Sequence, residues 1–282
     1  MAWLGALAIG LSLGLLGSGG SILTVPVLVY LVGEGEKVAI AESLAIVGLI
    51  AAVGSLRYAR SGRVRWRAVA LFGLPGMVGS VLGASAAAYL SGSAQLILFA
   101  IVMLLAAGWM LRPPRGLRSP PNQRQAQTPP DTDPREEPPR RAAAMMRDGL
   151  AVGALTGLVG VGGGFLIVPA LALLAGLPML TAVGTSLTII AMQSASGFLR
   201  HHQVLAERGL TVNLPLIATF AVLGVLGSLA GHHLGQRLDA RLPQHQLRRG
   251  FAAFLLIMAT VILVQRLELF SASGAAISFL LP

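Results

Sequence analysis

Three adjacent glycines, Gly162, Gly163 and Gly164, interrupt an apolar stretch that otherwise has the composition of a helix: residues 156–169 read TGLVGVGGGFLIVP. Glycine adopts positive φ readily and lets the backbone approach a ligand closely. A helix that begins after such a break presents unpaired N–H groups and a partial positive charge, which together bind anions without a charged side chain. The spacing therefore predicts a binding site for a small anion at this break.

The same pattern occurs a second time near the start of the chain. Residues 14–28 (GLLGSGGSILTVPVL) align with residues 157–171 (GLVGVGGGFLIVPAL), and nine of the fifteen positions are identical at an offset of 143. We expect the two breaks to face each other about a pseudo-two-fold axis near the middle of the membrane. The residues expected to line the first break are Ser18, Gly19, Gly20 and Ser21.

The glycines could instead serve only to pack helices closely. That alternative suits the GxxxG spacings at 79–83 and 227–231, which lie on long apolar segments, whereas the triple-glycine run favours a site. A nucleotide-phosphate loop is excluded, because no GK[ST] follows the glycines and no strand–helix–strand unit surrounds them.

Glu42, in AIAESLAIVGL, is the only acidic residue well inside an apolar segment. A carboxylate inside the membrane is costly and is by default a functional candidate, here for coupling transport to protons. The alternative is that Glu42 lies near the outer interface and is solvated. Its counterpart in the second half is Thr185, so the carboxylate is not part of the repeated pattern.

Uncharged polar residues on the same predicted helices could donate hydrogen bonds to an oxyanion. For the hydroxyl groups, the alternative is a hydrogen bond back to a carbonyl of their own helix, whereas the glutamine amide is predicted to line the transport path. These candidates are Ser43, Thr185, Ser186 and Gln193.

Two arginines, Arg57 and Arg200, occupy equivalent positions at the ends of the third predicted helix of each half. They are either anchors that snorkel to the membrane surface or a gate that attracts anions. No metal site is predicted, because the adjacent His232 and His233 point to different faces of a helix and no other ligand spacing is present.

The composition is that of a membrane protein. Hydrophobic residues make up 55% of the 282, charged residues 11%, and the mean hydropathy is +0.76. Several apolar segments approach the ~20 residues that span a bilayer. Despite the net charge of +10, the arginines lie in loops without interleaved aromatic residues, so nucleic-acid binding is not expected. Cysteine is absent, which excludes disulfides and iron–sulfur clusters, and no cofactor is expected.

We therefore predict an all-α, polytopic membrane helix bundle made of two repeats, with a glycine-broken pair of short helices and three full-length helices in each. The domains are a first repeat over 1–111, a disordered Pro/Arg-rich linker over 112–147, a second repeat over 148–266 and a tail over 267–282. The predicted helices are 2–17, 21–33, 38–56, 68–90 and 94–111, then 148–160, 164–177, 179–199, 212–234 and 250–265. The broken pairs either cross the membrane or form re-entrant hairpins.

Basic residues distinguish the loops. Five arginines fall within 57–67 and eight in the linker, whereas the loop at 200–209 has two; the loop at 235–249 is basic again, and its counterpart at 91–95 is uncharged. Because the bias swaps between equivalent loops, we expect the halves to be inverted, with both termini outside. This places every Lys and Arg in the cytoplasm except four: Lys37, Arg200, Arg208 and Arg266.

These motifs resemble a known family. GVGGGFLIVPAL (160–171) followed by GTSL (184–187), with the weaker echo GSGGSILTVPVL (17–28) and AESL (41–44), is similar to the TauE/SafE family of sulfite exporters. The resemblance covers nearly all of the chain outside 112–147 and the last dozen residues. It implies a permease for small sulfur anions, such as sulfite, thiosulfate, sulfonates or sulfoacetate.

The sequence and the resemblance together predict a secondary transporter, not an enzyme, that works by alternating access with proton or potential coupling. The alternatives are an intramembrane enzyme acting on lipid phosphates and a passive anion channel. The expected partners are a small anion and the lipid bilayer, with a homodimer left open. The expected location is the bacterial inner membrane, with the linker in the cytoplasm and the N-terminal helix retained.

Overall fold

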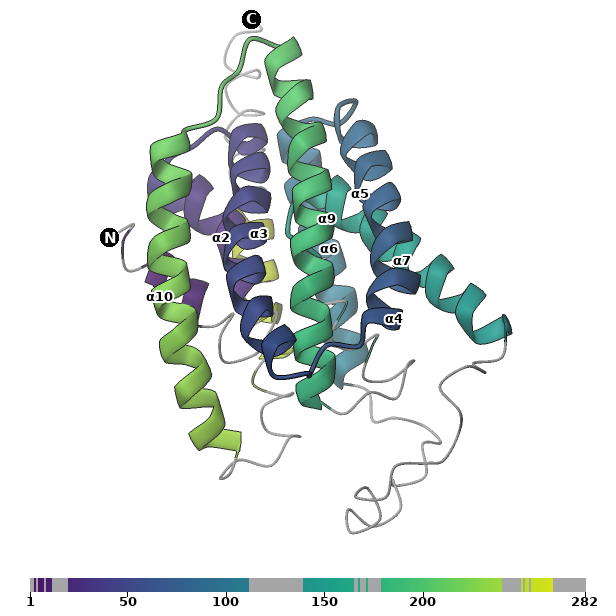
Figure 1. The fold of residues 1–282 in the computed structure, drawn as a ribbon. Coiled ribbons are helices and arrows are strands. Elements are labelled where there is room, and N and C mark those ends of the chain that lie inside the picture. Colours follow the sequence, from purple (N-terminus) through teal and green to yellow (C-terminus); the bar gives the residue numbers. More distant parts are fainter. Residues whose placement is uncertain are drawn as a thin grey trace, which may run out of the picture.

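All elements in the computed structural model are helices, as predicted, and the described residues contain no strand (Figure 1). The structure describes residues 3, 5–7, 9–11, 20–111, 139–164, 167, 171, 179–239, 250, 252–253 and 255–265.

The named helices account for most of this length, and the described residues of 3–11, 164–171 and 250–265 are mainly helical as well. In chain order they are α2 (Gly20–Pro26), the π-helix η1 (Val27–Val32), α3 (Glu36–Arg60), α4 (Trp66–Ala68), the π-helix η2 (Val69–Gly73), α5 (Leu74–Ala87), α6 (Gly92–Leu111), α7 (Pro139–Val159), α9 (Met179–Glu207) and α10 (Leu214–Asp239).

Five of these helical stretches are long and apolar enough to cross a membrane. They are Glu36–Arg60, Trp66–Ala87, Ala142–Val159, Thr181–Glu207 and Leu214–Gly231. Large apolar side chains also point outward from the bundle: Leu49, Leu105 and Leu226 are 49%, 68% and 54% exposed. An apolar outer surface on spanning helices fits lipid rather than water, so the chain is a multi-pass helical membrane protein.

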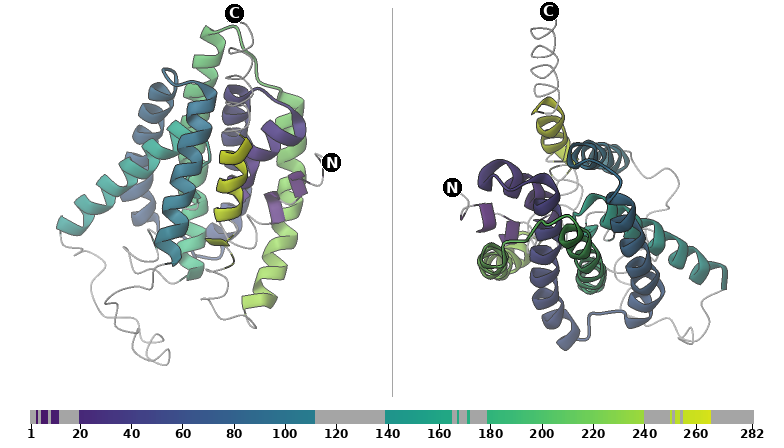
Figure 2. Two further views of the ribbon diagram at one scale, coloured as in Figure 1. Left: turned by 180° about the vertical axis from the view of Figure 1, so that it is seen from behind. Right: turned by 90° about the horizontal axis from the view of Figure 1, so that it is seen from above.

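The third helix of each half, α3 and α9, lie side by side in the middle of the bundle and run in opposite directions (Figures 1 and 2). Leu44, near the start of α3, packs against Gly197 in the second half of α9, and Tyr58, near the end of α3, packs against Gly184 near the start of α9. We call the end of the bundle that carries the α3–α4 loop, residues 61–65, the arginine-rich end.

The two halves touch at two equivalent close contacts between helices. In α7, a Cβ at Gly153 would overlap the carbonyl oxygen of Gly76 in α5, so the two backbones touch. A Cβ at Gly10 would likewise overlap the carbonyl oxygen of Gly224 in α10. Gly10 and Gly224 are the positions that correspond to Gly153 and Gly76 in the sequence repeat. Small residues permit this close packing of membrane helices.

The helix α7 corrects one predicted boundary. It begins at Pro139, so residues 139–147 are helical and not part of the linker, whose remainder lies outside the described residues. The prolines of the linker end at Pro139, a residue favoured at the first helical position, and the alanines, arginines and methionines that follow are good helix formers.

The predicted helix over 68–90 is also less regular than expected. The π-helix η2 precedes α5, whose second residue is Pro75, and α5 ends at Ala87. Proline has no N–H group to complete the ladder of the preceding turn, and π-turns accommodate such a disruption.

Candidate functional site

The second glycine break is a turn between two helices. α7 ends at Val159, and Gly162 and Gly163 then adopt φ of +68° and +61°, a conformation that costs other residues roughly 1–2 kcal/mol. A new helix begins here, because the N–H of Ile167 donates to the carbonyl of Gly163 at 3.1 Å. The N–H groups of Gly163 and Gly164 therefore have no partner inside that helix.

The chain folds back at this break. A Cβ at Gly163 would overlap the hydroxyl oxygen of Thr156, in the last two turns of α7. Both α7 and α9 start toward the arginine-rich end: Gly149 in α7 lies against Phe72, and Thr185 in α9 accepts a hydrogen bond from the N–H of Arg65. Because α7 and α9 point the same way, the chain has to run back toward the arginine-rich end between them. The predicted pair of short helices, 148–160 and 164–177, is consistent with such a reversal.

Two polar side chains of α9 lie against the break without hydrogen-bond partners. Gln193 and Ser194 are fully buried, and neither the amide atoms of Gln193 nor the hydroxyl of Ser194 has a partner among the described residues. The amide oxygen of Gln193 lies 3.6 Å from the Cβ position of Gly163, and the hydroxyl oxygen of Ser194 lies 3.1 Å from that of Gly162. Leaving such groups unpaired costs roughly 1–3 kcal/mol each, so the arrangement calls for a polar ligand.

Thr156, Val47 and Gly76 also border this site. A Cβ at Gly76 of α5 would overlap the amide nitrogen of Gln193. Thr156 donates its hydroxyl proton to the carbonyl of Val152 at 2.9 Å, which leaves its oxygen as an acceptor. A methyl group of Val47 lies 2.8 Å from the Cβ position of Gly162 and forms an apolar wall. Gln193 is the central residue of the 29-residue α9, so the site lies at mid-depth in the bundle.

The sequence predicted Gly162, Gly163, Gly164 and Gln193 but missed Thr156 and Ser194. Both occupy positions that are not polar in the first half, where the equivalent residues are Leu13 and Ala51. A search guided by the repeat passes over them. The available signal was the adjacency of Ser194 to Gln193 and the position of Thr156 two helical turns before Gly163.

Ser43 reaches this break from α3, whereas Ser186 bonds within its own helix. The hydroxyl of Ser43 lies within hydrogen-bond distance of the carbonyls of Ile40, at 2.8 Å, and Gly160. Ser186 donates to the carbonyl of Val183 at 2.8 Å, which is the repeat-equivalent of the Ser43–Ile40 bond. Both serines make the back-bond that the sequence offered as their alternative.

Glu42 and Thr185 make the same kind of bond in the two halves. Glu42 accepts a hydrogen bond from the N–H of Asn213 at 2.7 Å, and Thr185 accepts one from the N–H of Arg65 at 3.1 Å. Asn213 and Arg65 each directly precede the next helix, α10 or α4. Glu42 is fully buried, which contradicts its solvated alternative, and its second carboxylate oxygen has no partner among the described residues.

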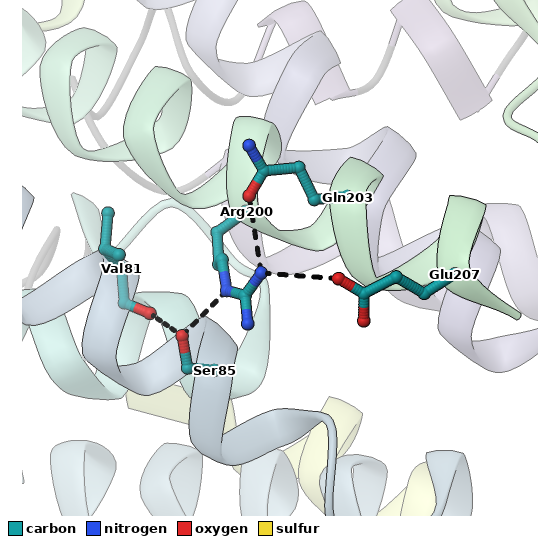
Figure 3. A network of polar contacts seen from close by, with 5 residues as sticks. All are labelled: Val81, Ser85, Arg200, Gln203 and Glu207. Atoms are coloured by element: carbon teal, nitrogen blue, oxygen red, sulfur yellow. Dashed lines mark hydrogen bonds and ion pairs between the residues drawn. The ribbon is translucent and has the colours of Figure 1, made fainter.

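The two paired arginines lie at opposite ends of the bundle. Arg57 is exposed in the last turn of α3, at the arginine-rich end. Arg200 donates to the hydroxyl of Ser85 at 2.9 Å and to the amide oxygen of Gln203 at 3.3 Å, and its guanidinium lies 3.9 Å from Glu207 (Figure 3). Neither arginine borders the second glycine break.

The first break is described only from its C-terminal side. Gly20 begins α2 and Ser21, the next residue, is fully buried, whereas Ser18 and Gly19 lie outside the described residues. The structure thus brings together the predicted residues of the second break only. No group of three or more His, Asp or Glu residues that could hold a metal occurs in the described part of the chain.

Comparison with known proteins adds to this geometry. Residues 2–262 match the family described as "Sulfite exporter TauE/SafE". A probable membrane transporter protein of Xylella fastidiosa is 32% identical over 90% of this chain and 91% of its own length. One from Methanocaldococcus jannaschii is 26% identical, with coverage of 84% and 86%, and one from Bacillus subtilis is 29% identical, with coverage of 66% and 72%. No solved structure gives a significant match.

The family match extends from the first described residues, through both glycine breaks, to the last described helix. Its length, together with the relative at 32% identity, agrees with a bundle of membrane-spanning helices built around a buried polar site. The chain therefore belongs to the sulfite exporter TauE/SafE family of membrane transporters.

Proposed function

We propose that this chain is a secondary transporter that carries a small sulfur-containing oxyanion or organosulfonate, with the anion bound at the second glycine break. The observation that carries the proposal is the set of buried polar atoms of Gln193 and Ser194, which have no partner in the described part of the chain and lie beside Gly162 and Gly163. The Ser194 hydroxyl and the N–H groups at a helix N-terminus can donate to an oxyanion, while the amide nitrogen of Gln193 lies against Gly76 of α5 and its oxygen faces Gly163. The family of sulfite exporters to which the chain belongs supports the sulfur chemistry.

Alternating access is supported by the arrangement of the two halves. The equivalent helices α3 and α9 run in opposite directions, and the Gly10–Gly224 and Gly153–Gly76 contacts occur at equivalent positions. Both features are expected of inverted repeats, which are common in secondary transporters. Gln193 and Ser194 are fully buried, which favours a carrier with an occluded site over an open channel.

We further propose that Glu42 couples transport to protons and that the arginine-rich end faces the cytoplasm of a bacterial inner membrane. The support for Glu42 is its complete burial, with one carboxylate oxygen that no described residue bonds, since an intramembrane carboxylate of this kind marks proton relays. The support for the orientation is the concentration of arginines in the α3–α4 loop.

The site assignment can be tested with two serines of α9. Ser194→Ala removes a hydroxyl that has no partner among the described residues, so the KM for transport should rise roughly tenfold while stability stays unchanged or rises. Ser196→Ala is the matched control, because the Ser196 hydroxyl already donates to the carbonyl of Gln193 at 2.9 Å; it should keep its KM. The measurement is uptake of labelled sulfite and methanesulfonate into proteoliposomes, with thermal unfolding in detergent.

Equal KM values for Ser194→Ala, Ser196→Ala and the unmodified protein would overturn the site. No uptake of any sulfur anion by well-inserted, unmodified protein would overturn the proposed substrate class. The same vesicles with and without an imposed pH gradient report on coupling.

A further inference from the structure

We propose that the second glycine break selects singly charged anions, such as sulfonates and hydrogensulfite, over doubly charged ones, such as thiosulfate and sulfite. This inference rests on the proposed function and specifies the substrate class of the same site. It follows from the complete absence of ionisable side chains in the chain segments that build the site.

The segments around the break carry no charge in the sequence. Residues 149–199, which include the end of α7, the break and most of α9, contain no Asp, Glu, His, Lys or Arg. The same holds for 43–56 of α3 and for 68–88, which include α5. The nearest cation along α9 is Arg200, seven residues beyond Gln193 and therefore roughly 10 Å away along the helix axis.

Three described cations at the end opposite the arginine-rich one, Lys37, Arg200 and Arg208, already have partners. Arg200 is engaged by Ser85, Gln203 and Glu207 (Figure 3). Lys37 donates to the carbonyl of Ala87 at 2.7 Å and also to that of Leu90, and Arg208 donates to the carbonyl of Ala88. The carbonyls that accept from Lys37 and Arg208 lie at or just beyond the C-terminal end of α5, where a helix attracts positive charge.

The nearest acid adds to the cost of a second negative charge. Glu42 directly precedes Ser43, whose hydroxyl reaches the carbonyl of Gly160 at the break. When Glu42 is ionised, its field repels an anion in the site, and the repulsion doubles for a dianion.

Neutral donors alone favour one charge over two. The desolvation cost of an ion rises with the square of its charge, while its attraction to fixed dipoles and hydrogen-bond donors rises only in proportion to the charge. At the break the donors are the Ser194 hydroxyl and the N–H groups of Gly163 and Gly164, because the amide oxygen of Gln193 faces Gly163 and its nitrogen lies against Gly76. None of the described residues that border the break is a cation that could balance a second charge. The methyl groups of Val47 on the facing wall provide contact for the organic part of a sulfonate.

The test is a competition assay with full-length protein in proteoliposomes, at the same pH on both sides of the membrane. Labelled methanesulfonate, a monoanion at every pH used, is the reporter. Unlabelled methanesulfonate should compete at least tenfold better than thiosulfate, a dianion throughout, which corresponds to about 1.4 kcal/mol. Sulfite passes from hydrogensulfite to its dianion near neutral pH, so its competition relative to methanesulfonate should fall as the pH rises.

Thiosulfate stays a dianion at every pH used, so its ratio to methanesulfonate records how titration of the protein affects the selection, including titration of Glu42 on α3 and of His201 on α9, whose Nε2 lies 2.7 Å from the carbonyl of Gly157 on α7. The sulfite ratio should therefore fall more steeply with pH than the thiosulfate ratio. Thiosulfate that competes as well as methanesulfonate would overturn the charge selection and leave the proposed function intact. If neither anion is carried, the proposed function fails and the selection with it.

A variant adds a second readout. Gln193→Lys places a cation in the site and should bring thiosulfate competition to within a few-fold of that of methanesulfonate. Unchanged competition in well-inserted variant protein would contradict the selection mechanism. If the lysine prevents insertion, the competition assay on the unmodified protein still decides.

Discussion

Glu42 and Thr185 show how one structural task can be filled by two chemically different residues. Each offers a side-chain oxygen to the N–H group just before the next helix, at Asn213 and at Arg65. Threonine completes that task with a neutral hydroxyl. Glutamate uses one carboxylate oxygen and leaves the second without a partner among the described residues, so only the first half can carry a titratable charge at this position.

The first prediction concerns Glu42. Glu42→Gln keeps an oxygen that can accept from Asn213, so the protein should insert normally, but uptake should no longer respond to an imposed pH gradient. Glu42→Thr, which copies the second half, should behave in the same way. Uptake measured across a series of pH gradients checks this, and an unchanged response in both variants would rule Glu42 out as the coupling residue.

The second prediction concerns Gly163. Gly163→Ala combines a positive φ of 61° with a Cβ that overlaps the hydroxyl oxygen of Thr156, so transport should fall by more than roughly tenfold through displacement of the break. Gly209→Ala is the matched control, because its φ is +69° but no atom lies within 4 Å of its Cβ position. Equal uptake by the two variants, at equal insertion, would mean that the geometry of the break does not matter.

Sequence reasoning found the residues of the site where composition is unusual. The triple glycine and a lone glutamine in an apolar helix stand out, and two of the three glycines, Gly162 and Gly163, take the expected positive φ. Ser194 and Thr156 were missed, because adjacency to Gln193 and spacing before Gly163 are weak signals when the role of a hydroxyl depends on which helix faces it. The bond between Glu42 and Asn213 joins residues 171 positions apart, a relation that no local pattern contains.

At the scale of elements, glycines bring the backbones of α5 and α7 into direct contact. We call it the glycine seam, formed by Gly76, Gly79 and Gly83 of α5 with Gly149, Gly153 and Gly157 of α7. A Cβ at four of these positions, Gly79, Gly83, Gly153 and Gly157, would overlap backbone atoms of the other helix. The seam ends beside the glycine break, so it fixes where α7 stops relative to α5.

The third prediction tests the seam. Gly153→Ala should force α5 and α7 apart and lower the free energy of unfolding by about 1–3 kcal/mol, the usual cost of overpacking. Gly108→Ala in α6 meets no atom within 4 Å and should leave stability unchanged or raise it, since alanine favours helix. Thermal unfolding in detergent compares the two, and an equally stable Gly153→Ala protein would show that the seam tolerates separation.

Helix positions were predictable where long apolar runs determine them, as for α3, α9 and α10. Ends were less predictable. α3 continues to Arg60 and α9 to Glu207, past the apolar residues, because polar residues extend a helix beyond the membrane without penalty. The start of α7 at Pro139 was obscured by the proline-rich composition just before it.

On the scale of the whole molecule, the two halves are interlocked and not stacked as separate units. α7 of the second half packs on α5 of the first, α9 packs on α3, and Gly10 of the first half packs on Gly224 of α10. The two halves are joined by the segment between Leu111, the end of α6, and Pro139, the start of α7. The chain can be cut within this segment without breaking a named helix.

The fourth prediction follows from this interlocking. Two fragments, 1–125 and 126–282, should each be unstable when expressed alone, because α3 and α5 in one and α7 and α9 in the other lack their partners. Coexpression should restore a complex with measurable uptake. Purification through a tag on one fragment, followed by the uptake assay, is the measurement. A second fragment that is stable by itself would contradict the interlocked arrangement.

The same interlocking has a consequence for synthesis in the cell. The first half leaves the ribosome before its partner helices have been made. The glycines of α5 and the carboxylate of Glu42 therefore stay without their contacts until the linker and the second half have been translated. Asn213, which bonds Glu42, is made 171 residues later. The first half therefore has to remain inserted without its partner helices during this interval, and the length of the linker sets part of the time between synthesis of Glu42 and of Asn213.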